Sequence, residues 1–126
     1  MKYLLDTNIF LEVLLAQERR EKCKTFLDDN VGTVSISDFS LHTIGVILFR
    51  NARDSLFTQF VKDVLSKVEI VTLPRSAYSD LETARAQYGL DFDDAYQYRT
   101  AKYYGLKLVT MDKDFKRTRD REILYL

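Results

Sequence analysis

The chain of 126 residues has the length of one domain, and its hydrophobic content of 46% is sufficient for a packed core. Lysine and arginine together number 19, as do aspartate and glutamate, so the net charge of zero does not indicate a nucleic-acid partner. A single cysteine, Cys23, and a single histidine, His42, exclude an internal disulfide and Cys- or His-rich zinc sites. We find no signal peptide and no apolar run of membrane-spanning length, which predicts a cytoplasmic protein.

The first fifty residues predict two strands and three helices. An apolar run at residues 3–5 indicates a short buried strand that ends at Asp6, and Thr7 or Asn8 can cap a helix at residues 9–15. This helix is apolar on nearly all sides, so we expect it to lie between layers or against a partner. The elements expected next are a charged helix at 18–29, a β-type run at 33–36, and a helix at 41–50 that Ser37 or Asp38 can cap.

The rest of the chain continues to alternate helices and strands. An amphipathic helix is indicated by the spacing of Phe57, Phe60, Val61, Val64 and Leu65. The elements predicted after it are a strand at 69–73 that Pro74 ends, a helix at 76–88 closed by Gly89, a helix from Asp91 to Tyr104 closed by Gly105, a strand at 107–110 and an edge strand at 122–126.

This alternation predicts the fold class. Strands that alternate with helices of about 10 to 15 residues pair in parallel through crossover helices. We therefore expect an α/β fold, a three-layer α/β/α sandwich with a central parallel sheet of four to five strands. Because no linker or repeat interrupts the pattern, a single domain is expected over residues 1–126.

Aspartates follow the predicted strands at positions that the topology brings to one edge of the sheet. Asp6 comes after the first strand, Asp38 after the second and Asp112 after the strand at 107–110, while Asp94 lies at the start of a helix. Ligands bind beyond the carboxyl ends of parallel strands, so these side chains are expected to converge.

Other aspartates near them have simpler interpretations. Asp91 is explained better as a helix N-cap, and Asp114 as a turn residue. Asp93 is explained equally well as a surface acid at a helix start and as a residue that supports a metal ligand. The predicted site therefore centres on Asp6, Asp94 and Asp112.

Converging carboxylates require a counter-charge. Two of them about 5 Å apart repel by roughly 3 kcal/mol at an effective dielectric constant of about 20. Oxygen ligands without cysteine or histidine select a hard ion, so Mg²⁺ or Mn²⁺ is predicted. Such an ion suits phosphodiester hydrolysis, because it polarises the phosphoryl oxygen, lowers the pKa of a bound water and orients the attack.

Motifs at both ends of the chain resemble those of PIN-domain ribonucleases. The opening motif is Leu5-Asp6-Thr7-Asn8, and the closing motifs are Asp94-Ala95 and the run Gly105-Leu-Lys-Leu-Val-Thr-Met-Asp112-Lys-Asp-Phe. The resemblance covers essentially the whole chain. It implies a PIN-like sandwich and a Mg²⁺- or Mn²⁺-dependent endoribonuclease that leaves a 5′-phosphate and a 3′-hydroxyl. Many small members of the family are toxins of VapC-type toxin–antitoxin pairs and are often dimeric.

The resemblance also implies roles for individual residues. The family's metal-ligand acids correspond to Asp6, Asp94 and Asp112. Its supporting polar residues correspond to Asn8 and Thr110, and the serine that begins its third helix corresponds to Ser37. The family usually carries a glutamate further along that helix, and this chain has none there. Asp38, Glu12 and Asp93 are candidates to replace it, whereas His42 is explained better by packing or capping.

Basic residues crowd around Asp112. Lys113, Lys116 and Arg117 are candidates to hold RNA phosphates beside the metal, and the alternative is a solvated charged loop. The partners expected are an RNA substrate, an antitoxin and a second copy of the chain. The helix at 9–15 and the helix around Phe57 are the candidate homodimer faces, unless both are used in the core.

The function predicted from the sequence is a metal-dependent ribonuclease. One alternative is a PIN-like module that has lost much of its cleavage and binds RNA or protein, which the missing glutamate favours. Another is a response-regulator-like receiver domain, which requires an acidic pair just after the first strand and a phosphoacceptor aspartate after the third. It is disfavoured, because the first strand here ends in Asp6-Thr7-Asn8 and the third strand runs into Pro74. DNA in place of RNA as the substrate stays open.

Overall fold

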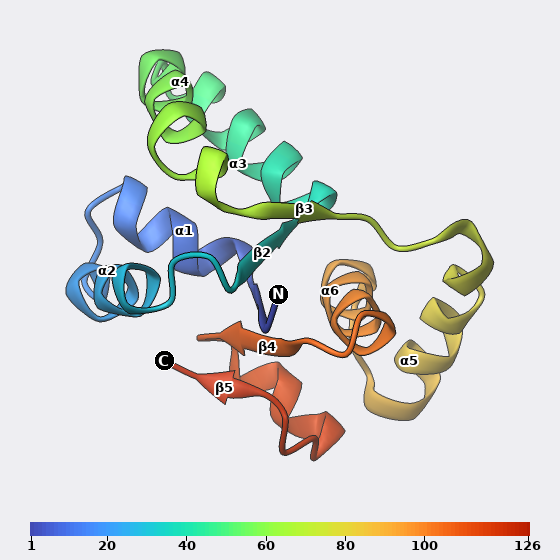
Figure 1. The fold of residues 1–126 in the computed structure, drawn as a ribbon. Helices are drawn as coiled ribbons and strands as arrows, with labels where there is room; N and C mark the ends of the chain where they lie inside the picture. The colour runs from blue at the N-terminus through green and yellow to red at the C-terminus, as the bar shows by residue number, and fades with distance from the viewer.

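A five-stranded sheet, parallel throughout, forms the centre of the computed structural model, which describes residues 1–126 (Figure 1). The strands are β1 Tyr3–Leu5, β2 Val34–Ser37, β3 Glu69–Val71, β4 Lys107–Thr110 and β5 Leu124–Tyr125. They lie in the order β3-β2-β1-β4-β5, so the first strand of the chain is the middle strand of the sheet. Leu4 of β1 lies beside Ser35 of β2 on one side and Leu108 of β4 on the other.

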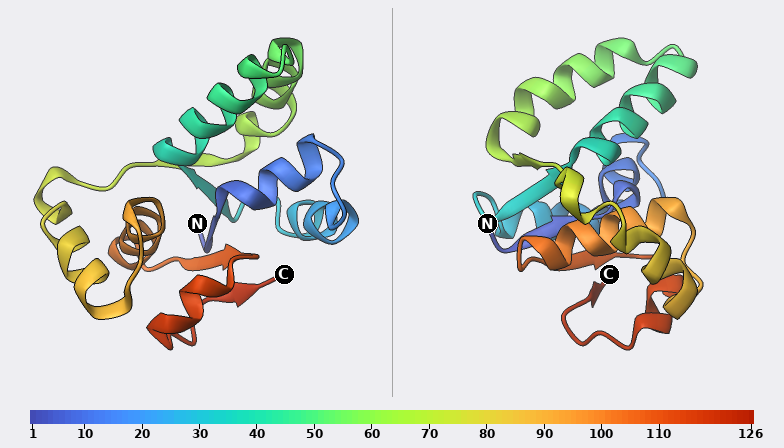
Figure 2. Two further views of the ribbon diagram at one scale, coloured as in Figure 1. Left: turned by 180° about the vertical axis from the view of Figure 1, so that it is seen from behind. Right: turned by 90° about the vertical axis from the view of Figure 1, so that its right-hand side faces the viewer.

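Helices cover both faces of this sheet. They are α1 Thr7–Leu14, α2 Arg20–Asp29, α3 Asp38–Arg50, α4 Asp54–Asp63, α5 Asp80–Tyr88 and α6 Phe92–Tyr103, with three short 3₁₀ helices, η1 Leu65–Lys67, η2 Arg75–Ala77 and η3 Lys113–Thr118. The first four α-helices pack on one face, and α5 and α6 pack on the other (Figures 1 and 2). The predicted α/β/α sandwich with a parallel sheet is therefore confirmed. None of the helices combines the length and the apolar character needed to cross a membrane.

Successive residues of the central strands face opposite layers. Leu4 belongs to the core beneath α5 and α6, whereas Leu5 belongs to the core beneath α1 to α4. Leu108 and Val109 of β4 divide in the same way. Burial on both faces is typical of a central strand in a parallel sheet, and it explains why residues 3–5 are apolar without alternation.

Some boundaries differ from the sequence prediction. The strand β3 ends at Val71 rather than at residue 73, because the Leu73 N–H donates to the hydroxyl of Tyr96 at 3.1 Å, outside the sheet. The helix predicted at 76–88 is divided into η2 and α5. The helix η3 was not predicted.

The helix α3 begins earlier than its apolar periodicity indicated. The Ser40 N–H donates to Ser37 Oγ at 3.0 Å, so Ser37 is the N-cap and the helix begins at Asp38. The early start brings the polar residues of the first turn of α3 to the carboxyl edge of the sheet.

Candidate metal centre

The carboxyl ends of the two central strands bring Asp6 and Asp112 to the same edge of the sheet. Asp6 follows β1 directly, and Asp112 lies just beyond β4. Leu5 and Val109 are neighbours in the parallel register, so the residues after both strands emerge together. The pairing extends past β1, because the Asp6 N–H donates to the Val109 carbonyl at 2.8 Å.

The Asp6 carboxylate is buried and is held at both of its oxygens. Its Oδ1 accepts from the Thr7 N–H at 2.9 Å and from Gln97 Nε2 at 3.2 Å, and its Oδ2 accepts from Thr110 Oγ1 at 2.8 Å. Burial raises the pKa of Asp6 above its ordinary value; the hydrogen bonds from Thr110, Gln97 and Thr7 oppose the rise, and the charge of Asp112 adds to it. A buried, oriented carboxylate thus forms the floor of the site.

Asp94 adds a third acid, from the first turn of α6. Its N–H donates to Asp91 Oδ1 at 2.9 Å, which caps α6 and places Asp94 in the first turn. Carboxylate oxygens of Asp94, Asp112 and Asp114 lie within 4.8 Å of one another. Burial, together with the charges of Asp91, Asp112, Asp6 and Asp114, raises the pKa of Asp94 to about 7.

These acids surround a hollow of about 170 Å³, here called the acidic pocket. The aspartates that line it are Asp6, Asp93, Asp94 and Asp112. Its other walls include Asn8 and Leu11 from α1, Gln97 from α6, and Phe39, Thr43 and Ile47 from α3. Asp93 therefore lies at the pocket itself, and α1 and α3 each contribute both polar and apolar residues to its walls.

The donor set of the acidic pocket fits a hard divalent cation. Its charged groups are carboxylates, and no cysteine or histidine lines it. Oxygen ligands of this kind favour Mg²⁺ or Mn²⁺ over Zn²⁺. Burial is the main cause of the raised pKa of Asp94 and the neighbouring carboxylates add to it, and a bound cation would offset their repulsion.

Comparison with known families identifies the fold. The sequence matches the profile of the PIN domain over residues 3–121. This chain belongs to the PIN domain family. No curated protein sequence matches it.

Solved structures of toxin–antitoxin proteins share this PIN fold. A toxin–antitoxin complex from Klebsiella pneumoniae is 23% identical, with a TM-score of 0.78 over 98% of this chain and 96% of that one. DNA-bound VapBC from Salmonella typhimurium is 19% identical, with a TM-score of 0.79 over 100% and 97% of the two chains. VapC20 of Mycobacterium tuberculosis, described as a Sarcin-Ricin loop cleaving toxin, is 14% identical, with a TM-score of 0.78 over 98% and 99%. At these identities the likeness establishes the fold.

Two acids considered from the sequence lie outside the acidic pocket of this PIN domain. Asp38 Oδ1 accepts from the Tyr96 hydroxyl at 2.6 Å and from the Phe39 N–H at 2.8 Å. Glu12, on α1, accepts at Oε2 from the N–H of Arg19 at 2.8 Å, and Arg19 lies in the loop between α1 and α2. The α3 wall of the pocket therefore presents no carboxylate.

The three polar residues predicted to support the site occupy different positions. Thr110 Oγ1 donates to Asp6 and accepts from the Asp112 N–H at 2.9 Å, so it contacts two of the acids. Ser37 caps α3 and donates to Gln97 Oε1 at 2.6 Å. It therefore reaches Asp6 only through Gln97, which itself donates to Asp6. Asn8 lines the pocket at the start of α1.

Two residues of the site were not anticipated from the sequence. Gln97 contacts Asp6 directly, and Ser40 Oγ accepts from Gln97 Nε2 at 2.7 Å. Helical spacing contained the signal, because Gln97 lies three residues after Asp94 and Ser40 three after Ser37, on the same helix faces. Polar residues at such positions, next to a candidate ligand, can be recognised as its hydrogen-bond partners.

The basic residues predicted to contact RNA lie on η3, beside the acids. Lys113, Lys116 and Arg117 are exposed. Arg117 donates to the Gly89 carbonyl at 3.1 Å and lies 3.4 Å from Asp114 Oδ1. The η3 segment therefore holds cationic groups at the rim, while Asp114 neutralises part of their charge.

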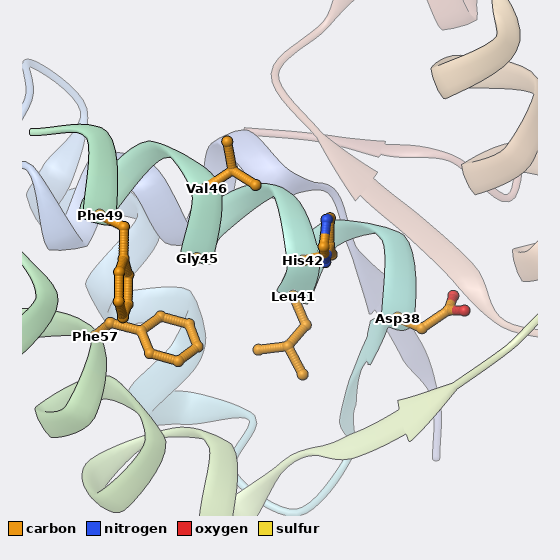
Figure 3. A pocket seen from close by; sticks show the side chains of 7 residues that line it. All are labelled: Asp38, Leu41, His42, Gly45, Val46, Phe49 and Phe57. Atoms are coloured by element: carbon orange, nitrogen blue, oxygen red, sulfur yellow. The ribbon is translucent and has the colours of Figure 1, made fainter.

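A larger hollow of about 540 Å³ lies between α3 and α4 and is here called the α3–α4 groove (Figure 3). Its wall is largely apolar, and Phe49, which is 61% exposed, contacts Phe57 edge-to-face at a ring-centroid distance of 5.9 Å. His42 and Asp38 lie along this groove rather than in the acidic pocket (Figure 3). The groove has no cluster of acids and is separate from the candidate metal centre.

Proposed function

We propose that this PIN domain is a metal-dependent endoribonuclease and the toxin of a toxin–antitoxin pair. The observation that carries the proposal is the convergence of Asp6, Asp94 and Asp112 at the carboxyl edge of the sheet. PIN domains are generally nucleases, and a structural neighbour is described as a toxin that cleaves the Sarcin-Ricin loop. Cleavage of cellular RNA, leaving a 5′-phosphate and a 3′-hydroxyl, would take place in the cytoplasm.

Asp94, Asp112 and Asp6 are the proposed ligands of Mg²⁺ or Mn²⁺, with Asp93 and Asp114 beside them. When bound, such an ion polarises the scissile phosphate and lowers the pKa of a water molecule. The chain contributes orientation: Thr110 and Gln97 hold both oxygens of Asp6, so the carboxylate cannot rotate freely.

RNA phosphates are proposed to bind along η3. Lys113 follows Asp112 directly, and Lys116 and Arg117 lie further along the same exposed helix. Cationic side chains beside an acidic pocket can bind the RNA phosphates that flank the cleaved one. The predominantly acidic pocket alone would repel the substrate.

The test is cleavage of a labelled RNA in Mn²⁺, with and without a chelator. We expect cleavage by the wild type only with the metal, and none by a folded Asp6→Asn variant. Asp28→Asn is the matched control, because Asp28 is an exposed acid on α2 that pairs with Lys24 at 2.9 Å. Full activity of a folded Asp6→Asn variant would remove the basis of the proposal.

Two protein partners are part of the proposal. An antitoxin is supported by the toxin–antitoxin complexes among the structural neighbours, and a basic side chain would complement the acidic pocket.

A homodimer is supported by the exposed Phe49 and by Val61, which is 37% exposed. Ile9 and Phe60, in contrast, are buried in the core and do not need a partner. Sedimentation of the wild type and of Phe49→Asp measures the dimer.

A second candidate function is a binding module with weakened cleavage. The observation that favours it is the α3 wall, which presents Thr43 in place of an acid. Calorimetric titration with Mn²⁺ separates the two functions, because a lost metal site would show little or no binding.

A further inference from the structure

Gln97 connects the candidate metal centre to the N-terminus of α3. Its Oε1 accepts from Ser37 Oγ at 2.6 Å, and its Nε2 donates to Ser40 Oγ at 2.7 Å and to Asp6 Oδ1 at 3.2 Å. A helix on one face of the sheet thus grips the first turn of a helix on the other face, and the contact includes the buried acid between them.

The surrounding donors fix which end of the Gln97 amide faces Asp6. Ser37 Oγ accepts from the Ser40 N–H at 3.0 Å, and its one proton has two acceptors in reach, Gln97 Oε1 at 2.6 Å and Ser40 Oγ at 3.2 Å, of which Gln97 is the nearer. The reverse orientation of the amide would place Oε1 against a carboxylate oxygen of Asp6, and two acceptors at that distance repel. The network therefore presents the Nε2 of Gln97 to Asp6 Oδ1.

We propose that Gln97 is a positioning residue that holds the Asp6 carboxylate in the orientation required to ligate the metal. The inference rests on the proposed nuclease function and names a further residue of that site. Gln97 is 1% exposed, so it does not reach an RNA bound above the pocket. A substitution therefore acts on cleavage through the contacts of Gln97 with Asp6 and with the first turn of α3, and the affinity for the metal reports the contact with Asp6.

The test replaces the amide without changing the length of the side chain. Gln97→Met removes the donor to Asp6 and keeps an unbranched chain of similar size. Thr100→Val is the matched control, because Thr100 is fully buried on the same helix and its hydroxyl donates only to the Tyr96 carbonyl, at 2.7 Å. Both variants are first compared with the wild type by circular dichroism.

Mn²⁺ affinity, measured by calorimetry without RNA, is the first readout. Partners of metal ligands typically contribute about 10- to 100-fold to metal affinity, so we expect Gln97→Met to weaken Mn²⁺ binding by at least about tenfold and Thr100→Val to leave it unchanged. Cleavage at saturating Mn²⁺ is the second readout. Gln97→Met should lower kcat while KM for RNA stays as in the wild type.

The outcomes separate this inference from the function on which it rests. A wild type that binds no Mn²⁺ overturns both. A wild type that binds Mn²⁺, beside a Gln97→Met variant that binds it equally well, overturns the inference alone. If Gln97→Met does not fold, Ser40→Ala decides, because it removes the acceptor that anchors Gln97 Nε2. We then expect a smaller loss of Mn²⁺ affinity in the same direction, and no loss would overturn the inference.

Discussion

Thr110 donates a hydrogen bond from Oγ1 to Asp6 Oδ2 at 2.8 Å, across 104 positions of the sequence. The same oxygen accepts from the Asp112 N–H at 2.9 Å. One hydroxyl group therefore joins the acid that follows β1 to the backbone of the acid that follows β4. The relative position of these two acids depends on it.

Thr110→Val should loosen both acids while keeping the shape of the side chain. It leaves a buried carboxylate oxygen and an N–H without their partner, which costs about 1–3 kcal/mol of the free energy of unfolding. We expect Mn²⁺ affinity to fall at least about tenfold. Thr110→Ser, which keeps the hydroxyl, is the control in urea unfolding and calorimetry. The link has no importance for the site if the two variants behave alike.

The stability of the metal-free protein should decrease as the pH rises toward neutrality. Burial and neighbouring carboxylates raise the pKa of Asp94 from 3.8 to about 7, so the folded chain retains a proton that the unfolded chain releases. Protonated Asp94 contributes its full stabilisation below the pKa that it has in the unfolded chain, and this contribution is lost as the pH rises through its pKa in the folded chain. Urea unfolding in a chelator should show a decrease between about pH 4 and pH 7, and a smaller one in Asp94→Asn.

Mn²⁺ provides the control for this pH dependence. A cation competes with the proton for Asp94, so added Mn²⁺ should stabilise the wild type most at the upper end of the range. Identical pH profiles for the wild type and Asp94→Asn would show that Asp94 does not carry the effect.

Thr43→Glu should strengthen metal binding. Thr43 lies on the α3 wall of the acidic pocket, and glutamate at this position adds a carboxylate on the side that has none. Glutamate is also the better helix former, so the backbone of α3 should tolerate it. We expect several-fold tighter Mn²⁺ binding by calorimetry, together with a lower melting temperature in a chelator because the added charge repels the others. Weaker Mn²⁺ binding in a folded variant would contradict this prediction.

Asp38→Asn and Glu12→Gln should leave Mn²⁺ affinity within about twofold of the wild type. Both carboxylates already accept hydrogen bonds elsewhere, from Tyr96 and from Arg19 respectively. Each amide keeps an oxygen that can accept those bonds, so the cost to stability should stay below about 1.5 kcal/mol. A large loss of metal affinity in either variant would contradict this prediction and identify that acid as a metal ligand.

The layers and the edge at which the acids meet follow from local patterns in the sequence. Alternating strands and helices require a parallel sheet, and parallel strands bring residues after them to one edge. Asp6 and Asp112 could therefore be placed together from residue order alone. Asp94 joined them because Asp91 caps α6 and fixes where that helix begins.

The direction of individual side chains could not be read in this way. Asp38 follows a strand just as Asp6 does, yet its carboxylate turns to the hydroxyl of Tyr96, 58 positions away. Asp114 was interpreted as a turn residue, and its N–H does donate to Asp112 Oδ1 at 2.8 Å, but its carboxylate also lies among the clustered acids. Both outcomes depend on contacts between distant parts of the chain, which local spacing does not encode.

The central position of β1 has a consequence for how the protein is made. Its neighbours in the sheet, β2 and β4, are separated by most of the chain. While the polypeptide is being synthesised, Asp6 leaves the ribosome long before Asp112, and the strand that must lie beside it does not yet exist. A nascent chain therefore carries no assembled acidic pocket until Asp112 has been synthesised.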